Sequence, residues 1–241
     1  MKRPTILNTE HLPRLFVDMD GTIAEWRNLS INVTAEEEAK SMMIEQKLNE
    51  ILYSPDYFLS LAPQQNVIDA VRYINNNKLA EVFISSCVMP DKDGISPTQQ
   101  KQDYIDKYLP EIDKDHRIFV PDGEDKKAYI PGGVKEDDYL LDDFTKNLVR
   151  WETPSSLPGT ETKGTAGKGI KLLNQINSHK NTWTGSKISY HSRPLDIVFD
   201  IAQIMYLDKT IIQHDPDKNR SSISAEDFLK NISDLPEDME K

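Results

Sequence analysis

The residues best suited to chemistry follow a short apolar run near the start of the chain. Residues 15–17 are apolar and β-prone, and the carboxylates of Asp18 and Asp20 come directly after them, before a Gly-Thr pair. An apolar run bounded by a glycine turn is typical of a buried strand, and open α/β sheets bind ligands at the carboxyl ends of such strands. Two neighbouring carboxylates there repel each other, and a divalent cation with oxygen ligands is the usual compensation. The sequence therefore predicts a hard-metal site around Asp18 and Asp20.

Two further apolar runs also end in polar side chains, and a helix expected after the second run offers a lysine. These groups are Ser85 and Ser86 after residues 81–84, Lys101 in the helix, and Asp142 and Asp143 after residues 139–141. Phosphoryl transfer requires a nucleophile, an acid–base group, donors for the phosphate oxygens, a lysine against accumulating charge, and oxygen-ligated Mg²⁺. Each strand-end acid alone is more often a turn or capping residue. Their coincidence at three strand ends favours a phosphoryl-transfer site.

The elements that must position these groups alternate between strands and helices. The predicted strands are residues 15–17, 81–84, 116–120, 139–141 and 170–173. Alternation of this kind indicates an α/β fold with a Rossmann-like, doubly wound parallel sheet. In such a sheet the carboxyl ends of the strands lie at one edge, so the polar groups above would come together.

Helices are predicted from apolar residues at helical spacing and from capping signals. The clearest start is Ser96 as N-cap, with Pro97 at the first helical position and Gln99 at the third. The expected helices are residues 35–52, a helix after Pro63 with Val67, Ile68, Val71 and Ile74 on one face, residues 96–109, residues 195–207, and a short last helix from Ser224. Residues 153–169, rich in Thr, Gly, Ser and Lys, are expected to be a flexible surface loop.

This order of elements divides the chain into three parts. Residues 1–23 and 63–210 form the expected α/β core, residues 24–62 a helical cap inserted after the first strand, and residues 211–241 a C-terminal extension. The insert falls between the first two groups of polar residues, so it is placed to roof the site and exclude water from it.

Composition narrows the classes of partner. The chain has 241 residues, a net charge of −11 and a single cysteine, Cys87. An acidic balance disfavours binding to long nucleic acids or to membrane surfaces, and one cysteine excludes an internal disulfide framework. No apolar leader and no membrane-spanning window are found, so we expect a cytoplasmic protein. A homodimer is left open as its assembly.

The stretches around the candidate residues resemble the motifs of the haloacid-dehalogenase-like phosphatase superfamily. These are an apolar run before D-x-D-G-[TV], a strand-terminal Ser or Thr, a Lys, and an acidic pair after an apolar run. The deoxyribonucleotidase branch, the 5′(3′)-pyrimidine nucleotidases and their phage and bacterial relatives, is the more similar over roughly residues 14–150. The matching stretches are Asp18-Met-Asp-Gly-Thr-Ile-Ala-Glu-Trp26 with D-M-D-G-V-L-A-D-F, Ile84-Ser-Ser-Cys-Val88 with I-C-T-S-P, Lys101-Gln-Asp-Tyr-Ile-Asp-Lys-Tyr-Leu109 with K-x-x-W-[VI]-x-x-x-L, and Tyr139-Leu-Leu-Asp-Asp143 with L-L-I-D-D.

The resemblance implies a role for each catalytic candidate. Asp18 would be the nucleophile that forms an aspartyl-phosphate, and Asp20 would protonate the leaving oxygen and then activate water. Ser85 and Ser86 would hold the phosphate, and Lys101 would neutralise it. A phosphatase that hydrolyses nucleoside or deoxynucleoside 5′-monophosphates is the function implied.

The same resemblance implies a Mg²⁺ cofactor. Its ligands would be Asp18, the backbone carbonyl of Asp20, and Asp143, while Asp142 would lie behind them and orient Lys101. Which of Asp142 and Asp143 is the direct ligand stays open.

Departures from the branch bear mainly on the substrate. Thr22 stands where the branch has Val, Ser85 where it has Thr, and Cys87 where it has Pro. Trp26 falls where the branch has an aromatic residue that stacks on the base, although a hinge or cap-core role is an alternative. Two other functions remain: a phosphatase for another small phosphomonoester, and a non-catalytic protein that binds a ligand with Mg²⁺.

Overall fold

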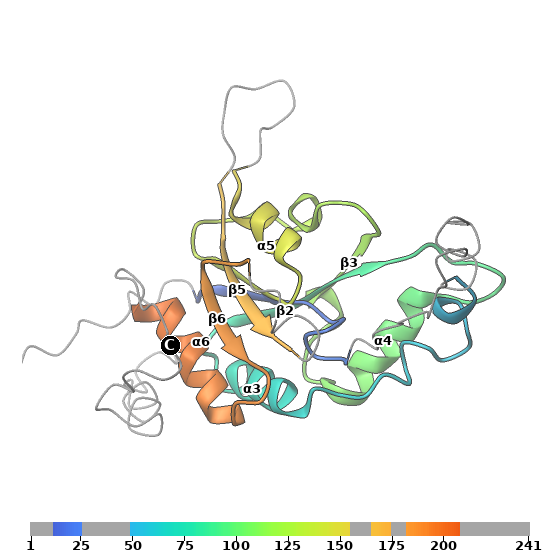
Figure 1. Ribbon diagram of the computed structural model, residues 1–241, viewed down its shortest axis with the longest axis horizontal. Helices are drawn as coiled ribbons and strands as arrows, with labels where there is room; N and C mark the ends of the chain where they lie inside the picture. The colour runs from blue at the N-terminus through green and yellow to red at the C-terminus, as the bar shows by residue number, and fades with distance from the viewer. Residues whose placement is uncertain (1–11, 26–48, 155–164, 175–181, 208–241) are drawn as a thin grey trace, which may run out of the picture.

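The computed structural model describes residues 12–25, 49–154, 165–174 and 182–207. Within these residues one six-stranded, all-parallel sheet has the order β3-β2-β1-β4-β5-β6 (Figure 1). This is a doubly wound order, so the predicted fold class is confirmed. The strands are β1 (Arg14–Val17), β2 (Glu81–Val88), β3 (Arg117–Pro121), β4 (Asp138–Asp142), β5 (Lys168–Leu173) and β6 (Ser186–Ser189).

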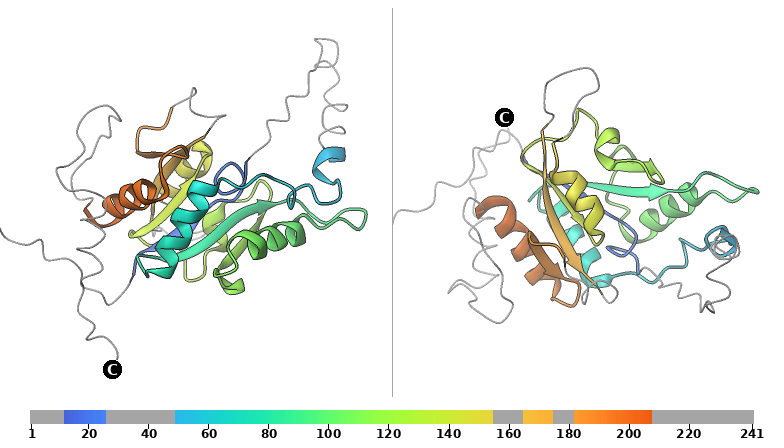
Figure 2. Two further views of the ribbon diagram at one scale, coloured as in Figure 1. Left: turned by 90° about the horizontal axis from the view of Figure 1, so that it is seen from below. Right: turned by 45° about the horizontal axis from the view of Figure 1, so that its top comes forward.

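Helices cover both faces of the sheet. The α-helices are α3 (Gln65–Asn76), α4 (Pro97–Tyr108), α5 (Thr145–Glu152) and α6 (Pro194–Leu207), and the short 3₁₀ helices are η1 (Lys114–His116) and η2 (Lys126–Tyr129). Figures 1 and 2 show α5 on one side of the sheet and α3 with α6 on the other. Apolar residues of α3, α4 and α6 share one core cluster, and those of α5 belong to a second. The sheet therefore separates two cores.

Strand β1 is buried on both faces because every residue of it is apolar or paired. Leu15 and Val17 face the larger core, whereas Phe16 faces the smaller one and stacks on Phe83 with ring centroids 4.9 Å apart. A central parallel strand covered on both sides has this near-continuous apolar composition. Its burial explains why the run that opens the candidate site is so apolar.

The amino end of β1 is fixed by a buried ion pair. The Arg14 guanidinium donates to both carboxylate oxygens of Asp138, from Nε at 2.8 Å and from Nη2 at 2.6 Å. It also donates to the backbone carbonyls of Pro131 and Gly133 at 3.0 and 2.7 Å. This paired, fully hydrogen-bonded geometry ties β1 to β4 at the edge of the sheet opposite to the site.

Sheet register brings the candidate residues to one level. Val17 pairs with Ile84 on one side and with Leu141 on the other. The backbone N–H of Asp18 then donates to the carbonyl of Leu141 at 2.9 Å. Because these strands are parallel, the residues that follow them lie at the same carboxyl edge, as predicted.

Most predicted elements are confirmed, with bounds shifted by one or two residues except at the carboxyl end of β2. The α4 start is as expected, since the Ser96 hydroxyl accepts from the Gln99 N–H at 3.3 Å. Strand β2 runs on to Val88, so Ser85 and Ser86 lie inside the strand and not after it. The predicted C-terminal bound of the loop over residues 153–169 is wrong, because Lys168 and Gly169 belong to β5.

Other expectations lie wholly or partly outside the described residues. The helix predicted over residues 35–52 is described only from residue 49, and residues 49–52 are helical. The last helix, from Ser224, and the C-terminal extension fall outside. No helix in the described ranges has the length and apolar character needed to cross a bilayer.

Candidate active site

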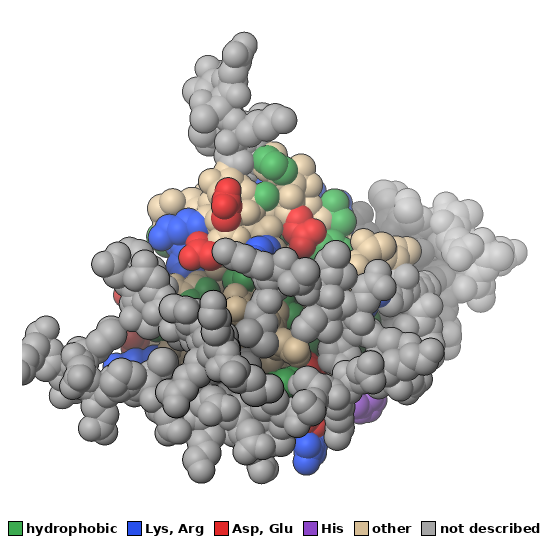
Figure 3. Space-filling view, turned by 90° about the vertical axis from the view of Figure 1, so that its left-hand side faces the viewer, with side chains coloured by type: hydrophobic (Ala, Val, Ile, Leu, Met, Phe, Trp, Pro, Cys, Tyr) green, Lys and Arg blue, Asp and Glu red, His purple; other side chains and the backbone are tan. Residues whose placement is uncertain are grey.

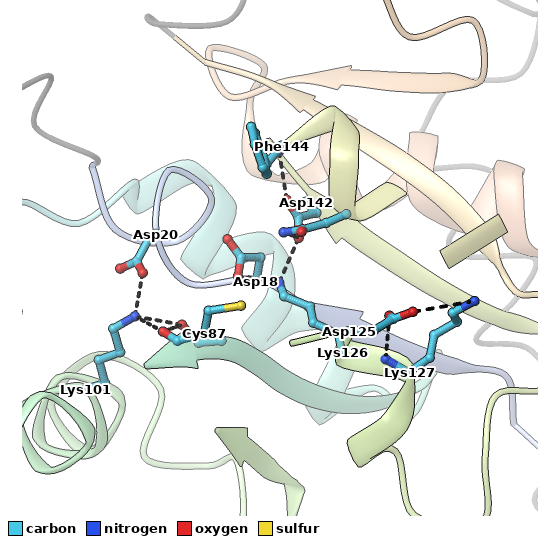
Figure 4. A network of polar contacts seen from close by, with 11 residues as sticks. Asp18, Asp20, Cys87, Lys101, Asp125, Lys126, Lys127, Asp142 and Phe144 are labelled. Carbon is cyan, nitrogen blue, oxygen red and sulfur yellow. Dashed lines mark hydrogen bonds and ion pairs between the residues drawn. The ribbon is translucent and has the colours of Figure 1, made fainter. Parts of the chain in front are cut away.

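Asp18 lies at the centre of the carboxyl edge and is held by a lysine from a distant part of the chain. Lys126 Nζ is 2.6 Å from Asp18 Oδ1 and 2.7 Å from Asp142 Oδ2. Figure 4 shows the lysine between the two carboxylates. Burial acts to lower the pKa of Lys126, but the attraction of Asp142 and Asp18 outweighs it and raises the pKa, so the group stays an ammonium.

The Asp142 carboxylate is fixed by three donors. Its Oδ1 accepts from the backbone N–H of Phe144 at 2.7 Å, and its Oδ2 accepts from Asn147 Nδ2 at 2.9 Å as well as from Lys126. The side chain of Asp142 has no exposed surface. With Oδ2 already accepting twice, this carboxylate is suited to orient Lys126 and retains little capacity for a further ligand.

Asp143 is positioned against the turn that follows β1. Asn174 Nδ2 donates to Asp143 Oδ2 at 2.7 Å and to the carbonyl of Gly21 at 2.8 Å, so it joins the ends of β4, β5 and β1. Gly21 has a φ of +80°, and a Cβ at this position would lie 2.5 Å from Asp143 Oδ2. Only glycine satisfies both the left-handed backbone and this close approach.

Three carboxylates converge at this edge. Asp18, Asp142 and Asp143 each offer an oxygen, and these oxygens lie within 4.8 Å of one another. Burial raises the pKa of Asp18 well above its ordinary value, against the opposing attraction of Lys126. Burial and then repulsion by Asp142 raise the pKa of Asp143 to about 7. Crowded, buried carboxylate oxygens of this kind are the donor set that a hard divalent cation binds.

Asp20 lies beside this group and is held by the second lysine. Lys101 Nζ from α4 contacts Asp20 Oδ2, donates to Ser86 Oγ at 3.0 Å and donates to the carbonyl of Cys87 at 2.6 Å. The Lys101 side chain is only 1% exposed. In Figure 4 the two lysines approach the carboxylates from opposite sides. Lys101 therefore anchors one oxygen of Asp20 and Lys126 anchors Asp18.

The two serines of β2 face opposite sides of the sheet, because alternate residues of a strand do so. Ser86 points toward α4 and accepts from Lys101. Ser85 Oγ is buried and has no hydrogen-bond partner among the described residues. A buried hydroxyl without a protein partner calls for an explanation, and a bound oxyanion is one.

Cys87 follows the serines and is half-buried. Burial raises the pKa of its thiol, with a further rise from Asp18 that the lysines oppose. A raised pKa favours the neutral thiol over the nucleophilic thiolate. Cys87 is therefore not suited to be a nucleophile here.

The structure brings together all but one of the described residues that the sequence nominated. Asp18, Asp142 and Asp143 form the acidic group, and Asp20, Lys101 and Ser86 form a hydrogen-bonded set next to it. Ser85 is the exception, because its buried hydroxyl lies on the opposite face of β2 from Ser86. Trp26 lies outside the described residues. One expectation is wrong: Asp142 does not orient Lys101 but bonds to Lys126.

Sequence reasoning missed three polar residues of this site: Lys126, Asn147 and Asn174. Asn147 and Asn174 carry no recognisable motif. Lys126 stands in the run Glu124-Asp-Lys-Lys127, which looks like a solvated loop. The available signal was its place shortly after the third strand, where a parallel sheet brings side chains to the same edge.

Comparison with known proteins gives matches in structure only. No protein-family model matches the chain, and no curated protein matches it significantly. A haloacid dehalogenase-like hydrolase from Burkholderia xenovorans is 11% identical, with 78% of this chain and 95% of that one covered and a TM-score of 0.41. The HAD domain of the effector protein Lem4 from Legionella pneumophila is 15% identical, with coverages of 58% and 76% and a TM-score of 0.31. At these low scores, the class of the protein rests on its own sheet order and side chains: a doubly wound α/β protein with a buried carboxylate–lysine centre.

Proposed function

We propose that the protein is a Mg²⁺-dependent phosphomonoesterase that hydrolyses nucleoside or deoxynucleoside 5′-monophosphates. The observation that carries the proposal is the buried chain Asp18–Lys126–Asp142, with Asp20 and Asp143 on either side at one sheet edge. These residues supply candidates for the nucleophile, the acid–base group, the neutralising lysine and the metal ligands that phosphoryl transfer requires.

The reaction proceeds in two displacements. The Asp18 carboxylate attacks phosphorus, the bond from phosphorus to the ester oxygen breaks, and the Asp20 carboxylic acid gives its proton to the leaving alcohol. Water then attacks the aspartyl-phosphate, and Asp20 takes the proton of that water. Inorganic phosphate leaves and Asp18 is restored as a carboxylate.

Charge on the phosphate is balanced from two sides. Lys126 contacts Asp18 directly, so it lies where charge accumulates on the transferring phosphoryl group. On the β2 side, the Ser86 hydroxyl beside Lys101 and the unpartnered Ser85 hydroxyl are the candidate donors for the phosphate oxygens. We therefore assign the neutralising role to Lys126, and we assign Lys101 chiefly to Asp20.

The carboxylates fit a Mg²⁺ ion. Asp18, Asp143 and the backbone carbonyl of Asp20 would hold it, while Asp142 orients Lys126 because its oxygens already accept three hydrogen bonds. Bound there, the ion would offset the mutual repulsion of the carboxylates and attract the anionic substrate.

The nucleotide substrate rests on the similarity of the motifs to those of the deoxyribonucleotidase branch. The cap over residues 24–62, with Trp26, is the expected site of base recognition. A small molecule is favoured over a long nucleic acid because the chain is acidic, with a net charge of −11. Where described residues are visible on the face shown in Figure 3, acidic and basic side chains lie interspersed.

A non-catalytic ligand-binding protein is the competing function. A protein that had lost catalysis would be expected to lack one of the two catalytic carboxylates. Both Asp18 and Asp20 are present here, and each contacts a lysine. The intact pair favours the enzyme.

Hydrolysis assays on the full chain test the proposal. We expect release of phosphate from p-nitrophenyl phosphate and from nucleoside monophosphates with Mg²⁺, abolished by EDTA and restored by added Mg²⁺. No turnover across a broad panel of phosphomonoesters would reject the enzyme, and turnover of sugar phosphates alone would reject the nucleotide assignment.

A further inference from the structure

The C-terminal part of the insert, residues 54–58, is hydrogen-bonded to α4 through one side chain. Gln100 Oε1 accepts from the backbone N–H of Phe58 at 2.9 Å, and Gln100 Nε2 donates to the carbonyl of Ser54 at 3.4 Å. Gln100 is buried, and its bond to Phe58 is shielded from water. The glutamine thus fixes residues 54–58 against the helix that carries Lys101.

The ring of Phe58 completes the link to the site. Lys101 Nζ lies 4.6 Å from its centroid, and the ring is 3% exposed. A cation over an aromatic face is attracted to it, most strongly where both groups are buried. Phe58 therefore covers the one ammonium that contacts Asp20 among the described residues.

The same helix also contacts the other end of the insert. Tyr104 of α4 donates from its hydroxyl to the carbonyl of Ile23 at 3.2 Å. The two flanks of the insert bond to each other, since the Glu25 N–H donates to Ala62 and the Gln64 N–H to Ile23, both at 2.8 Å. Helix α4 is thus the common support of both flanks.

The two oxygens of Asp20 differ in their surroundings. Oδ2 contacts Lys101, whereas Oδ1 is buried and has no hydrogen-bond partner in the described part of the chain. Proton transfer requires heavy atoms about 2.6–3.2 Å apart, so the position of Oδ1 decides whether the leaving oxygen receives its proton. That position depends on how firmly Lys101 holds Oδ2.

We propose that Gln100 and Phe58 are positioning residues for the acid–base step: acting through Lys101, they fix Asp20 so that Oδ1 faces the leaving group. The placement of residues 54–58 at the exit of the insert is then linked to proton transfer and not to phosphate binding. This inference rests on the proposed phosphomonoesterase function.

Two leaving groups separate proton transfer from phosphate binding. Nitrophenolate leaves as a stable anion, whereas the alkoxide of a nucleoside or of glycerol requires a proton. A well-placed general acid contributes about 10²–10⁴-fold, so partial misplacement should cost roughly tenfold on the alkyl esters. We expect Gln100→Ala and Phe58→Leu to lower kcat/KM for a nucleoside monophosphate or glycerol phosphate by about tenfold, and for p-nitrophenyl phosphate by roughly twofold or less.

Gln99→Ala is the matched control. Gln99 is the preceding glutamine of α4. Its side chain is exposed and donates from Nε2 to Asp103 Oδ1 at 2.8 Å. This variant should match the wild type on both substrates. The inhibition constant of inorganic phosphate should be unchanged in all three variants, and equal melting temperatures would show that the fold is intact.

Equal losses on both classes of ester, or weaker inhibition by phosphate, would overturn the inference, as would full activity of both variants. If Gln100→Ala does not fold, Phe58→Leu keeps an apolar side chain of similar volume and decides alone. The wild type decides the proposed function separately: its failure to hydrolyse any phosphomonoester rejects that function, whereas the variants concern only the positioning roles.

Discussion

Lys126 offers the sharpest test of the site. Of two variants that both lack its ammonium and are both expected to be inactive, one should be strongly destabilised and the other should recover most of its stability. Lys126→Met removes the ammonium between Asp18 and Asp142, whose side chains are 9% and 0% exposed. Removing one partner of a buried ion pair costs about 3–5 kcal/mol because a buried charge is left uncompensated. The free energy of unfolding of the whole domain is only about 5–15 kcal/mol, so the loss should be plain in chemical denaturation without metal.

The second variant adds Asp142→Asn to Lys126→Met and removes one of the two stranded charges. We expect it to recover most of the lost stability but none of the activity. For activity, loss of a cation at the developing charge should lower kcat by roughly 10²–10³-fold. The assays are urea denaturation with EDTA, and Mg²⁺-dependent hydrolysis of p-nitrophenyl phosphate.

Lys101→Met is the comparison that would refute this assignment. If Lys101→Met weakens inhibition by inorganic phosphate more than Lys126→Met does, then Lys101 neutralises the phosphate, as the sequence alone predicted. A Lys126→Met enzyme with a third or more of the wild-type rate would also contradict the reasoning.

Four further predictions follow from the same contacts. Asp18→Asn should lower turnover by several powers of ten, and a variant with a tenth of the wild-type rate would reject Asp18 as nucleophile. Because the pKa of Asp143 is raised to about 7, Mg²⁺ must displace a proton from Asp143 below that pH. Calorimetry should therefore show that the affinity for Mg²⁺ rises from pH 5 to pH 8. An affinity that does not change over this range would contradict the prediction. Arg14→Met should lower the free energy of unfolding by about 3–5 kcal/mol, since it strands the buried Asp138, while kcat/KM of the folded protein stays unchanged. Trp26→Ala should raise KM for nucleoside monophosphates by roughly ten- to a hundred-fold and leave p-nitrophenyl phosphate nearly unaffected, as base stacking contributes about 1–3 kcal/mol; equal losses on both would refute stacking.

The elements that the sequence predicts well are those whose residues carry a local signal. Residues 15–17 of strand β1 are an uninterrupted apolar run, and α3 buries Val67, Ile68, Val71 and Ile74 on the face predicted from their spacing. The α4 start carries its own capping residues. Signals of this kind depend on neighbours in the chain, so they survive without knowledge of the fold.

The missed elements lack such signals. Strand β6 is Ser-Lys-Ile-Ser, in which only Ile188 is buried, and it lies at the edge of the sheet. Helix α5 has eight residues, begins at Thr145 after an N-cap residue, Phe144, that gives no side-chain cap, and buries only Leu148 and Trp151. Tertiary packing stabilises such short elements, and packing is not visible in local periodicity.

The assignment of the two lysines shows the same limit within the site. Lys101 stands at a motif-like spacing in a clearly capped helix, so sequence reasoning gave it the phosphate. Lys126 belongs to a charged run with no periodicity, and only the parallel order of β2, β1 and β4 brings η2 over Asp18. The acids could be located from sequence because each ends its own strand. The pairing of each lysine with its carboxylate depends on the tertiary structure at the carboxyl edge of the sheet, where four segments meet. There Lys126 pairs with the proposed nucleophile, Asp18, and Lys101 pairs with the proposed proton donor, Asp20.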